Sequence, residues 1–278
     1  MSVSVPFPVR KAATVMLLRD AADGLEVFML RRNPKSVFVP GQFVFPGGAV
    51  DVSDSKESSL EDICVGLDDM KASQLMSIES AGLSYWVAAI RECFEEAGVL
   101  LARRDGVVMS FNEPKTYERF EGYRSQVYDG SLNLRDMCRQ EGLHLDLNDL
   151  RYVSHWITPI GPPKRFDTRF FLARSPEEQE PLHDGGETVE SCWITPAEAQ
   201  RLHSEGKFEM IMPTVANLEP LLACSSVDEA MAWADSLSEI PAILPAIATT
   251  ENGTEVYMPG EAGYEDALAN PPGEGSTQ

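Results

Sequence analysis

Three glutamates crowd one and a half turns of a predicted helix. In "AAIRECFEEAGVLL" (88–101), Arg91 and Glu92 are followed by Glu95 and Glu96. An α-helix turns every ~3.6 residues, so positions i, i+3 and i+4 share one face and these carboxylates repel one another. Clusters of oxygen ligands suit Mg²⁺ or Mn²⁺, and such a cation removes the repulsion. The alternative interpretation is an acidic face in solvent.

The residues around the glutamates predict where that face points. Apolar side chains recur at steps of three and four, which is typical of a helix packed on a core. Gly98 supplies the expected stop. Arg91, four residues before Glu95, is in reach to orient that carboxylate. The apolar positions are Leu83, Val87, Ile90, Phe94 and Ala97.

The segment "RECFEEAGV" resembles the distal half of the Nudix box, R-E-U-x-E-E-x-G-U with U apolar, and "FPGG" (45–48) resembles the glycine pair that opens the box. The resemblance implies the Nudix fold, an α/β architecture with a mixed sheet sandwiched between helices. It also implies that Arg91 and Glu92 act in catalysis, and that Gly48 approaches the substrate phosphate. The metal ligands it implies are Glu92, Glu95, Glu96 and the main chain at Gly47.

The box is split by an insertion. Positions 49–90 place forty-two residues between Gly48 and Arg91, far more than the family pattern has. The upstream glutamate of the pattern is Leu83 here. An inserted acid could replace it, and Asp51, Asp54 and Glu79 remain open as candidates.

Nudix hydrolases cleave a nucleoside diphosphate linked to another moiety, and this reaction needs a general base as well as a metal ion. The family commonly uses a glutamate of the box or of a later loop. Glu187 and Glu190 in "DGGETVESCW" are the candidates. We prefer Glu190 because it lies three residues before Trp193 of a predicted strand.

The split box and "HWITPIGPPKRFDTRFFLAR" (155–174) resemble the branch of the peroxisomal coenzyme A diphosphatases. This resemblance implies hydrolysis of coenzyme A or acyl-CoA to 3′,5′-ADP and (acyl-)phosphopantetheine. ADP-ribose, a nucleotide sugar or a dinucleotide is the alternative substrate, and a nucleotide-sensing module without turnover is the alternative of another class.

The 3′-phosphate of coenzyme A requires cations outside the metal cluster. We favour Arg165 first, because prolines stiffen its loop and aromatic neighbours could stack an adenine. The full set of candidates is Arg31, Arg32, Lys164, Arg165 and Arg169.

The composition limits the classes of partner that we expect the protein to bind. The chain has 23 basic and 44 acidic residues and a net charge of −21, which argues against a nucleic-acid-coating surface and leaves a small-molecule nucleotide as the expected partner. No apolar run is long enough for a membrane span, and the start lacks a secretory signal, so we expect no membrane contact and a cytoplasmic location. The five cysteines are scattered and are expected to be reduced.

The predicted organisation has three parts. Residues 10–206 form the Nudix domain, with insertions at about 52–81 and 110–149. Residues 207–240 form a C-terminal helical extension, and 241–278 form a mostly loose tail in which "EVYMP" could add a strand. The inserted helices either cap the pocket or build a subunit contact, so a homodimer is one option.

Overall fold

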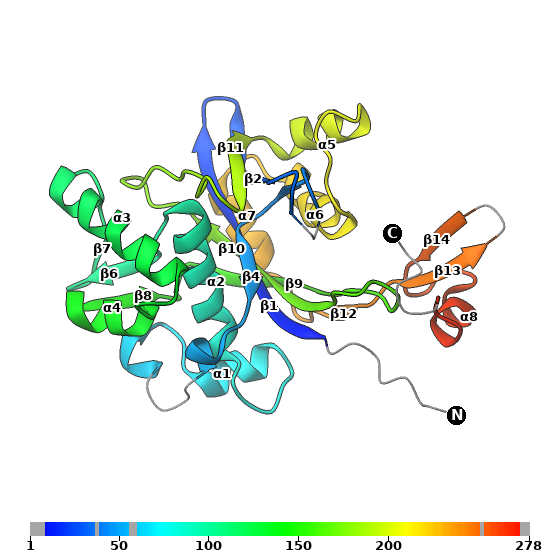
Figure 1. Cartoon of the computed structure of the whole chain (residues 1–278), viewed down its shortest axis with the longest axis horizontal. Helices are drawn as coiled ribbons and strands as arrows, with labels where there is room; N and C mark the ends of the chain where they lie inside the picture. The colour runs from blue at the N-terminus through cyan, green and yellow to red at the C-terminus, as the bar shows by residue number, and fades with distance from the viewer. Residues whose placement is uncertain (1–8, 37–38, 56–59, 251–252, 273–278) are drawn as a thin grey trace.

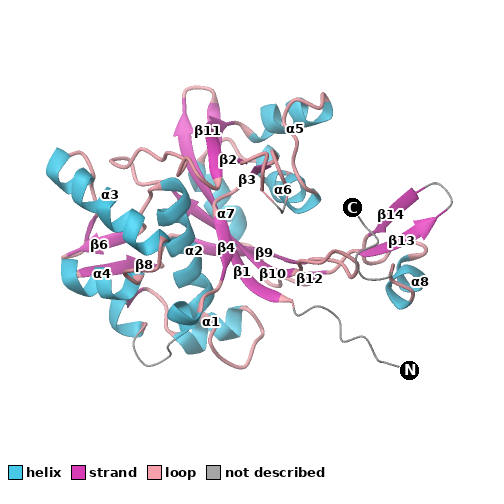
Figure 2. Ribbon diagram, viewed as in Figure 1, coloured by secondary structure: helices cyan, strands magenta, loops and turns pink. Residues whose placement is uncertain are grey.

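The computed structural model describes residues 9–36, 39–55, 60–250 and 253–272. Residues 56–59 of the predicted first insertion, and 251–252 and 273–278 of the predicted tail, lie outside the described residues. A mixed sheet of eight strands forms the centre, with helices on both sides (Figures 1 and 2).

The order of the central sheet is β11-β2-β1-β10-β9-β12, with β3 paired to β2 and β4 paired to β1. β1 runs parallel to β10 and antiparallel to β2 and β4. The strands are β1 (Arg10–Ala21), β2 (Gly24–Arg32), β3 (Phe43–Val44), β4 (Gly47–Ala49), β9 (Leu150–Ile157), β10 (Phe166–Arg174), β11 (Thr188–Ile194) and β12 (Ala242–Ile243).

Each face of the sheet carries its own apolar cluster. Along β1, Val15 and Leu17 join a cluster with helix α2 (Leu83–Ala97), whereas Met16 and Leu18 join a second cluster with the C-terminal helices. This follows because successive side chains of a strand point to opposite faces. α2, α3 and α4 lie on one side and α5 and α6 on the other (Figure 1). The predicted mixed sheet between helices is confirmed.

The predicted helix at 83–97 is α2, and Gly98 ends it with a φ of 70°. The other helices are α1 (Asp69–Leu75), α3 (Pro114–Tyr128), α4 (Leu134–Glu141), α5 (Pro196–Ser204), α6 (Met212–Leu218), α7 (Val227–Asp235) and α8 (Tyr264–Ala269), with 3₁₀ turns η1 (Val52–Ser55), η3 (Glu61–Ile63) and η4 (Pro220–Ala223). Within the described ranges, none of these helices has the length and apolarity needed to cross a bilayer.

A small second sheet beside α2 combines one strand from each insertion with two strands that follow α2. Its order is β5-β8-β6-β7, and α3 and α4 pack near it (Figure 2). It joins the two inserted segments, because β5 pairs in parallel with β8. The strands are β5 (Cys64–Val65), β6 (Ala102–Arg104), β7 (Val107–Val108) and β8 (Leu143–Asp146).

The tail departs from its expectation. The sequence predicts a mostly loose tail from 241 to 278, whereas its described part contains β12, a hairpin of β13 (Ala246–Thr250) and β14 (Gly253–Tyr257), and α8. A small cluster of Ala246, Tyr264 and Ala267 holds the hairpin to α8, and the Tyr264 hydroxyl donates to the Leu244 carbonyl. β14 is the strand expected in "EVYMP". The division into domain, extension and tail stays a prediction.

A buried polar cluster joins β9 to β10. Asp167 Oδ1 lies 2.7 Å from His155 Nε2 and 2.5 Å from the Arg169 guanidinium. Burial alone would raise the pKa of Asp167, but the hydrogen bond of His155 and the charge of Arg169 lower it below its usual value. The carboxylate therefore stabilises the fold while it is charged.

We predict that Asp167→Asn lowers the free energy of unfolding by about 2–4 kcal/mol near pH 7, because buried Arg169 loses its counter-ion. The pKa of Asp167 is lower in the folded than in the unfolded state. Its stabilisation is therefore present above the unfolded-state pKa of about 3.9 and is lost as the pH falls through the folded-state pKa. Urea denaturation of both proteins from about pH 7 to about pH 3 should show the difference narrowing at acid pH. A difference that stayed constant would contradict this assignment.

Candidate active site

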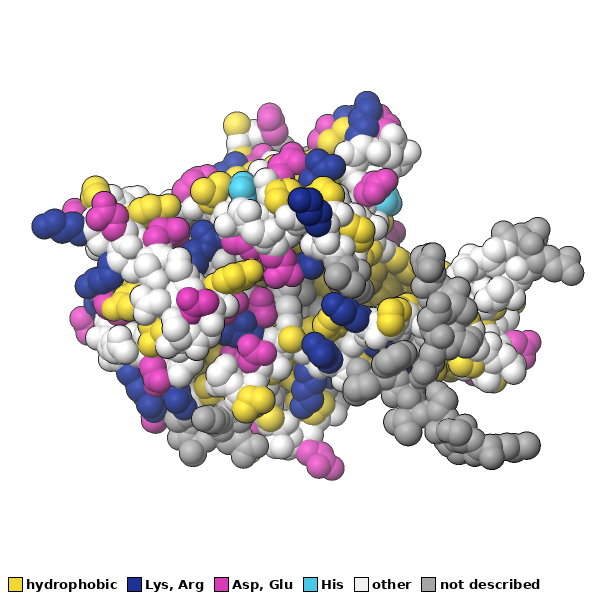
Figure 3. Space-filling view, viewed as in Figure 1, with side chains coloured by type: hydrophobic (Ala, Val, Ile, Leu, Met, Phe, Trp, Pro, Cys, Tyr) yellow, Lys and Arg dark blue, Asp and Glu magenta, His cyan; other side chains and the backbone are white. Residues whose placement is uncertain are grey.

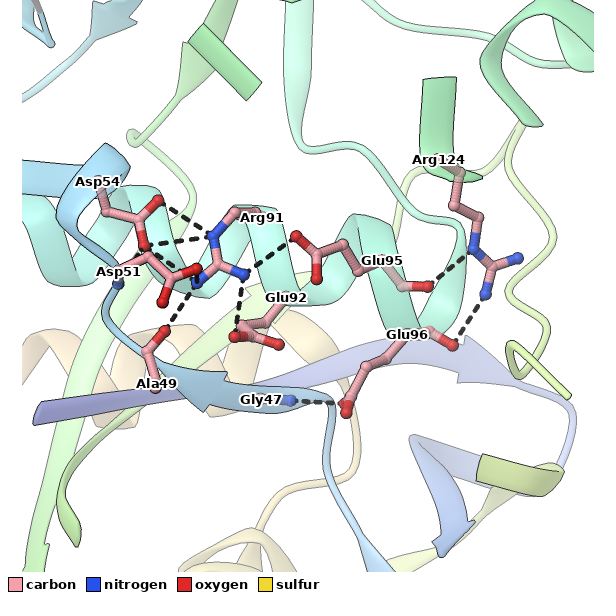
Figure 4. Close-up of polar contacts among 9 residues, drawn as sticks. All are labelled: Gly47, Ala49, Asp51, Asp54, Arg91, Glu92, Glu95, Glu96 and Arg124. Atoms are coloured by element: carbon pink, nitrogen blue, oxygen red, sulfur yellow. Dashed lines mark hydrogen bonds and ion pairs between the residues drawn. The ribbon is translucent and has the colours of Figure 1, made fainter. Parts of the chain in front are cut away.

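Helix α2 directs Glu92 and Glu96 toward β4, and Glu95 toward the Arg91 guanidinium (Figure 4). The side chains of Glu92 and Glu95 are 12% and 11% exposed, and Glu96 is 3% exposed. The acidic face therefore does not lie in solvent, and the solvated interpretation is wrong. Nearly the whole helix is buried, because α2 lies between the central sheet and the inserted elements.

Arg91 is the centre of the charge arrangement (Figure 4). Its guanidinium lies 3.0 Å from Glu92 Oε1 and 3.0 Å from Glu95 Oε1, and it donates to the Ala49 carbonyl at 2.7 Å. Burial opposes the charge of Arg91, but the carboxylates of Glu92 and Asp54 outweigh burial and raise its pKa. Arg91 is therefore charged at any pH at which the protein is folded, and it links α2 to β4.

Asp54 is the acid that the insertion supplies to Arg91. Its two carboxylate oxygens accept from Arg91 Nε at 3.1 and 3.2 Å, and the Asp54 side chain is 2% exposed. Asp51 is 3.8 Å from the guanidinium and largely exposed. Of the three open candidates for the missing box glutamate, Asp54 has the best contact with Arg91, and the backbone N–H of Asp51 orients it at 2.8 Å.

The glycine pair allows β4 to approach the glutamates closely. Gly47 N–H donates to Glu96 Oε2 at 2.9 Å. A Cβ added to Gly48 would lie 2.5 Å from Glu92 Oε1, inside normal contact distance. Gly48 therefore lacks a side chain for a steric reason.

The buried carboxylates raise one another's pKa. Burial is the largest cause for Glu92, whose pKa is raised to about 8, and the charge of Glu95 adds to it. Burial also raises the pKa of Glu96 well above its usual value, and the nearby charges of Glu92 and Glu187 act in the same direction. Arg91 thus does not compensate all the negative charge that α2 brings into this site.

The two candidates for the general base lie on opposite faces of the central sheet. Glu190 pairs with Arg31 at 3.1 Å, and both belong to the sheet face that carries the C-terminal helices, because Arg31 also lies over the Phe43 ring. Side chains alternate along a strand, so Glu190, three residues before Trp193 in a regular stretch of β11, faces the opposite side of the sheet from Trp193. Glu187, the other candidate, pairs with Arg32 at 2.8 Å, and both charges act on Glu96.

The three arginines predicted to bind substrate are therefore dispersed. Arg32 is near Glu96, whereas Arg31 faces the other side of the sheet. Buried Arg165 donates Nε–H to the carbonyls of Thr158 and Pro159, so it braces its own loop. The structure does not place Arg31 or Arg165 with the glutamates.

Sequence reasoning missed Arg124 of α3. Its guanidinium donates to the carbonyls of Glu95, Glu96 and Leu182, each at 2.9 Å (Figure 4). Gly98 makes room for it, because a Cβ there would lie 3.0 Å from an Arg124 nitrogen. The sequence points to Arg124 only indirectly. A helix that ends on glycine leaves backbone carbonyls unpaired, and a cation can bind them.

Comparisons with known proteins agree with this geometry. The family described as the NUDT19 Nudix domain matches residues 67–221. The chain is a Nudix hydrolase. The acyl-coenzyme A diphosphatases NUDT19 of Xenopus laevis and Homo sapiens are both 26% identical to it, over 87% of this chain and 72% and 73% of theirs. A crystal structure of a NUDIX hydrolase from Alicyclobacillus acidocaldarius is 30% identical, has a TM-score of 0.67, and covers 81% of this chain and 96% of its own.

The glutamates of this Nudix hydrolase are candidate ligands for a divalent cation. In the described part of the chain, no three acidic, histidine or cysteine side chains surround one point, because Arg91 and the Gly47 N–H hold the glutamates. The chemistry nevertheless fits. Buried carboxylates with raised pKa values and uncompensated charge are suitable oxygen ligands for Mg²⁺ or Mn²⁺, which would compete with Arg91 for Glu92 and Glu95.

Gly48→Ala should reduce hydrolysis at least about a hundredfold while leaving the melting temperature within about 3 °C. The new methyl group would displace the flexible Glu92 carboxylate rather than the backbone. Gly122→Ala on α3 is the matched control, since nothing lies within 4 Å of its added Cβ. Full activity in Gly48→Ala would show that the close approach has no function.

Arg124→Met should cost about 2–4 kcal/mol of unfolding free energy, because three buried carbonyls lose their donor. Arg119→Met is the control on the same helix: Arg119 is 46% exposed and pairs with Glu141 at 3.2 Å, so its loss should cost less than about 1 kcal/mol. Urea denaturation measures both. Equal losses of unfolding free energy in the two variants would mean that the contacts of Arg124 with α2 stabilise the protein no more than an exposed ion pair does.

Proposed function

We propose that this Nudix hydrolase cleaves the diphosphate of coenzyme A or acyl-CoA, yielding 3′,5′-ADP and (acyl-)phosphopantetheine, with Mg²⁺ or Mn²⁺ bound by Glu92, Glu95 and Glu96. The observation that carries the proposal is the burial of these glutamates against the glycine pair of β4, with Arg32 and Glu187 beside Glu96. The names of the NUDT19 relatives support the choice of substrate.

The reaction is hydrolysis of a phosphoanhydride. The oxygen of water forms a new bond to one phosphorus, the bond from that phosphorus to the bridging oxygen breaks, and the bridging oxygen leaves with the other phosphate. The bound cation would neutralise the charge on the phosphates and make water more acidic. The proton lost by water needs an acceptor within hydrogen-bond reach.

Glu187 is our candidate for that acceptor. Its side chain is 40% exposed, so water can reach it, and its pairing with Arg32 holds it on the face of the sheet that carries the glutamates. The Arg32 side chain is 14% exposed and is placed to release Glu187 and bind a phosphate oxygen when substrate enters. Arg91 orients Glu92 and Glu95 without touching the substrate.

The assay incubates the purified protein with coenzyme A, an acyl-CoA, ADP-ribose and a dinucleotide, each with Mg²⁺ or Mn²⁺, and separates the products by chromatography. We expect 3′,5′-ADP from the first two substrates and a higher kcat/KM for them than for the others. Faster cleavage of ADP-ribose or the dinucleotide would replace the proposed substrate. Tight binding of nucleotides with no cleavage would identify a sensing module.

Three isosteric variants test the roles of the glutamates. Glu96→Gln should lose at least about a hundredfold in kcat, close to 3 kcal/mol of transition-state stabilisation, while its melting temperature in EDTA is not lowered, because a buried charge is removed. Glu187→Gln should lose at least about tenfold in kcat. Glu190→Gln, on the other face, is the matched control and should retain activity. A larger loss in Glu190→Gln than in Glu187→Gln would reverse the assignment of the base.

A further inference from the structure

Two cations lie against the ring of Tyr85 at the start of the catalytic helix. Lys11 Nζ is 5.8 Å from the ring centroid and the Arg169 guanidinium carbon is 5.3 Å from it. They come from neighbouring strands, β1 and β10, and face α2. Both distances are within the range of a cation–π interaction, so the ring holds two positive groups at one place.

Lys11 differs in its neighbours from the arginines that pair with a carboxylate. Arg31, Arg32 and Arg91 each pair with a carboxylate, whereas no carboxylate among the described residues lies within 4.0 Å of the exposed Lys11 ammonium. Asp167, which pairs with Lys11 across β1 and β10, is engaged with His155 and Arg169, and Asp51 lies 3.8 Å from the Arg91 guanidinium. Lys and Arg side chains gather near the start of β1 (Figure 3).

Arg169 also has unused hydrogen-bonding capacity. It is 3% exposed, Asp167 accepts from one of its terminal nitrogens, and its Nε has no hydrogen-bond partner. A buried donor without an acceptor costs about 1–3 kcal/mol, so an anion that reached this place would satisfy it. Tyr85 does not oppose an anion, because burial raises its pKa to about 12 and keeps its hydroxyl neutral.

Lys11 and Tyr85 lie at a defined distance from the glutamates and the glycine pair. Tyr85 and Glu92 are seven residues apart on one face of α2, which corresponds to about 10 Å along the axis. On β1, Lys11 lies two residues before Ala13, which pairs with Gly48, so it is about 7 Å along the strand from the glycine pair. One ribose with phosphates on two of its hydroxyls spans a separation of this order.

We propose that Lys11, supported by Tyr85 and Arg169, binds a second phosphate of the substrate: a phosphomonoester on the ribose of the nucleoside diphosphate whose anhydride lies at the glutamates. This inference rests on the proposed function and names the group that selects the substrate. The anhydride of a nucleoside diphosphate binds at the glutamates whether or not its ribose is phosphorylated. A substrate with a phosphorylated ribose also meets the Lys11 ammonium, which has no carboxylate of the described residues within 4.0 Å.

The test compares coenzyme A with 3′-dephospho-coenzyme A, which differ only in that phosphate. For the parent protein, we expect kcat/KM to be at least about tenfold higher for coenzyme A, which is the worth of one charge-assisted hydrogen bond. Lys11→Met should abolish this preference by raising KM for coenzyme A, and Lys11→Arg should restore most of it. Lys115→Met, at an exposed lysine of α3, is the matched control and should keep the preference of the parent.

The outcomes separate the inference from the function. If the parent cleaves both compounds and Lys11→Met leaves their ratio unchanged, the subsite is not at Lys11. If Lys11→Met slows both equally, Lys11 acts on the diphosphate or on the fold and the inference is overturned. If the parent cleaves neither compound, the proposed function itself fails.

Discussion

The structure of the site depends on how the charge of Arg91 is shared. One guanidinium contacts the carboxylates of Glu92, Glu95 and Asp54 and the carbonyl of Ala49, so it joins α2, the strand with the glycine pair and the inserted 3₁₀ turn η1. A planar guanidinium with several donors in fixed directions can make such contacts together, which a lysine could not. Because Arg91 is buried, each contact also satisfies a donor that would be costly to leave unpaired.

The insertion inside the box packs against the same helix and contacts Arg91. Loop-closure entropy grows slowly with loop length, so a long excursion between β4 and α2 costs little if its residues find partners. Leu60, Ile63, Ala72 and Met76 pack into the cluster under α2, and Asp54 returns to Arg91. The second insertion reaches the same helix from its other end through Arg124. Both insertions therefore brace the helix that carries the glutamates.

Sequence patterns predicted the helix at 83–97, the glycine stop and the mixed sheet, because these depend on local periodicity and on residues close in the chain. They did not show which partner each charged side chain of β11 takes. Glu190 faces away from Trp193, as strand alternation requires, and pairs with Arg31, whereas Glu187 pairs with Arg32. The loop carbonyls of Thr158 and Pro159 accept hydrogen bonds from Arg165 Nε, which no pattern of residue types reveals, and the role of Arg165 in binding substrate stays a prediction. The sequence named Asp54 as one of three candidate acids but could not select it, because its contact with Arg91 spans thirty-seven positions of the chain.

An acidic protein that acts on an anionic substrate must concentrate positive charge locally. With a net charge of −21, most of its cations are taken by its own carboxylates, and at the glutamate site the buried acids exceed the arginine that pairs with them. A bound divalent cation would make the local charge positive for any diphosphate. It would therefore promote cleavage without selecting strongly among substrates. Choice must then come from cations that the protein leaves unpaired at a defined distance from the anhydride. Under this proposal the glutamates of α2, which share the charge of Arg91, bind the cation, while the first turn of the helix lies beside the Lys11 ammonium, which has no carboxylate of the described residues within 4.0 Å.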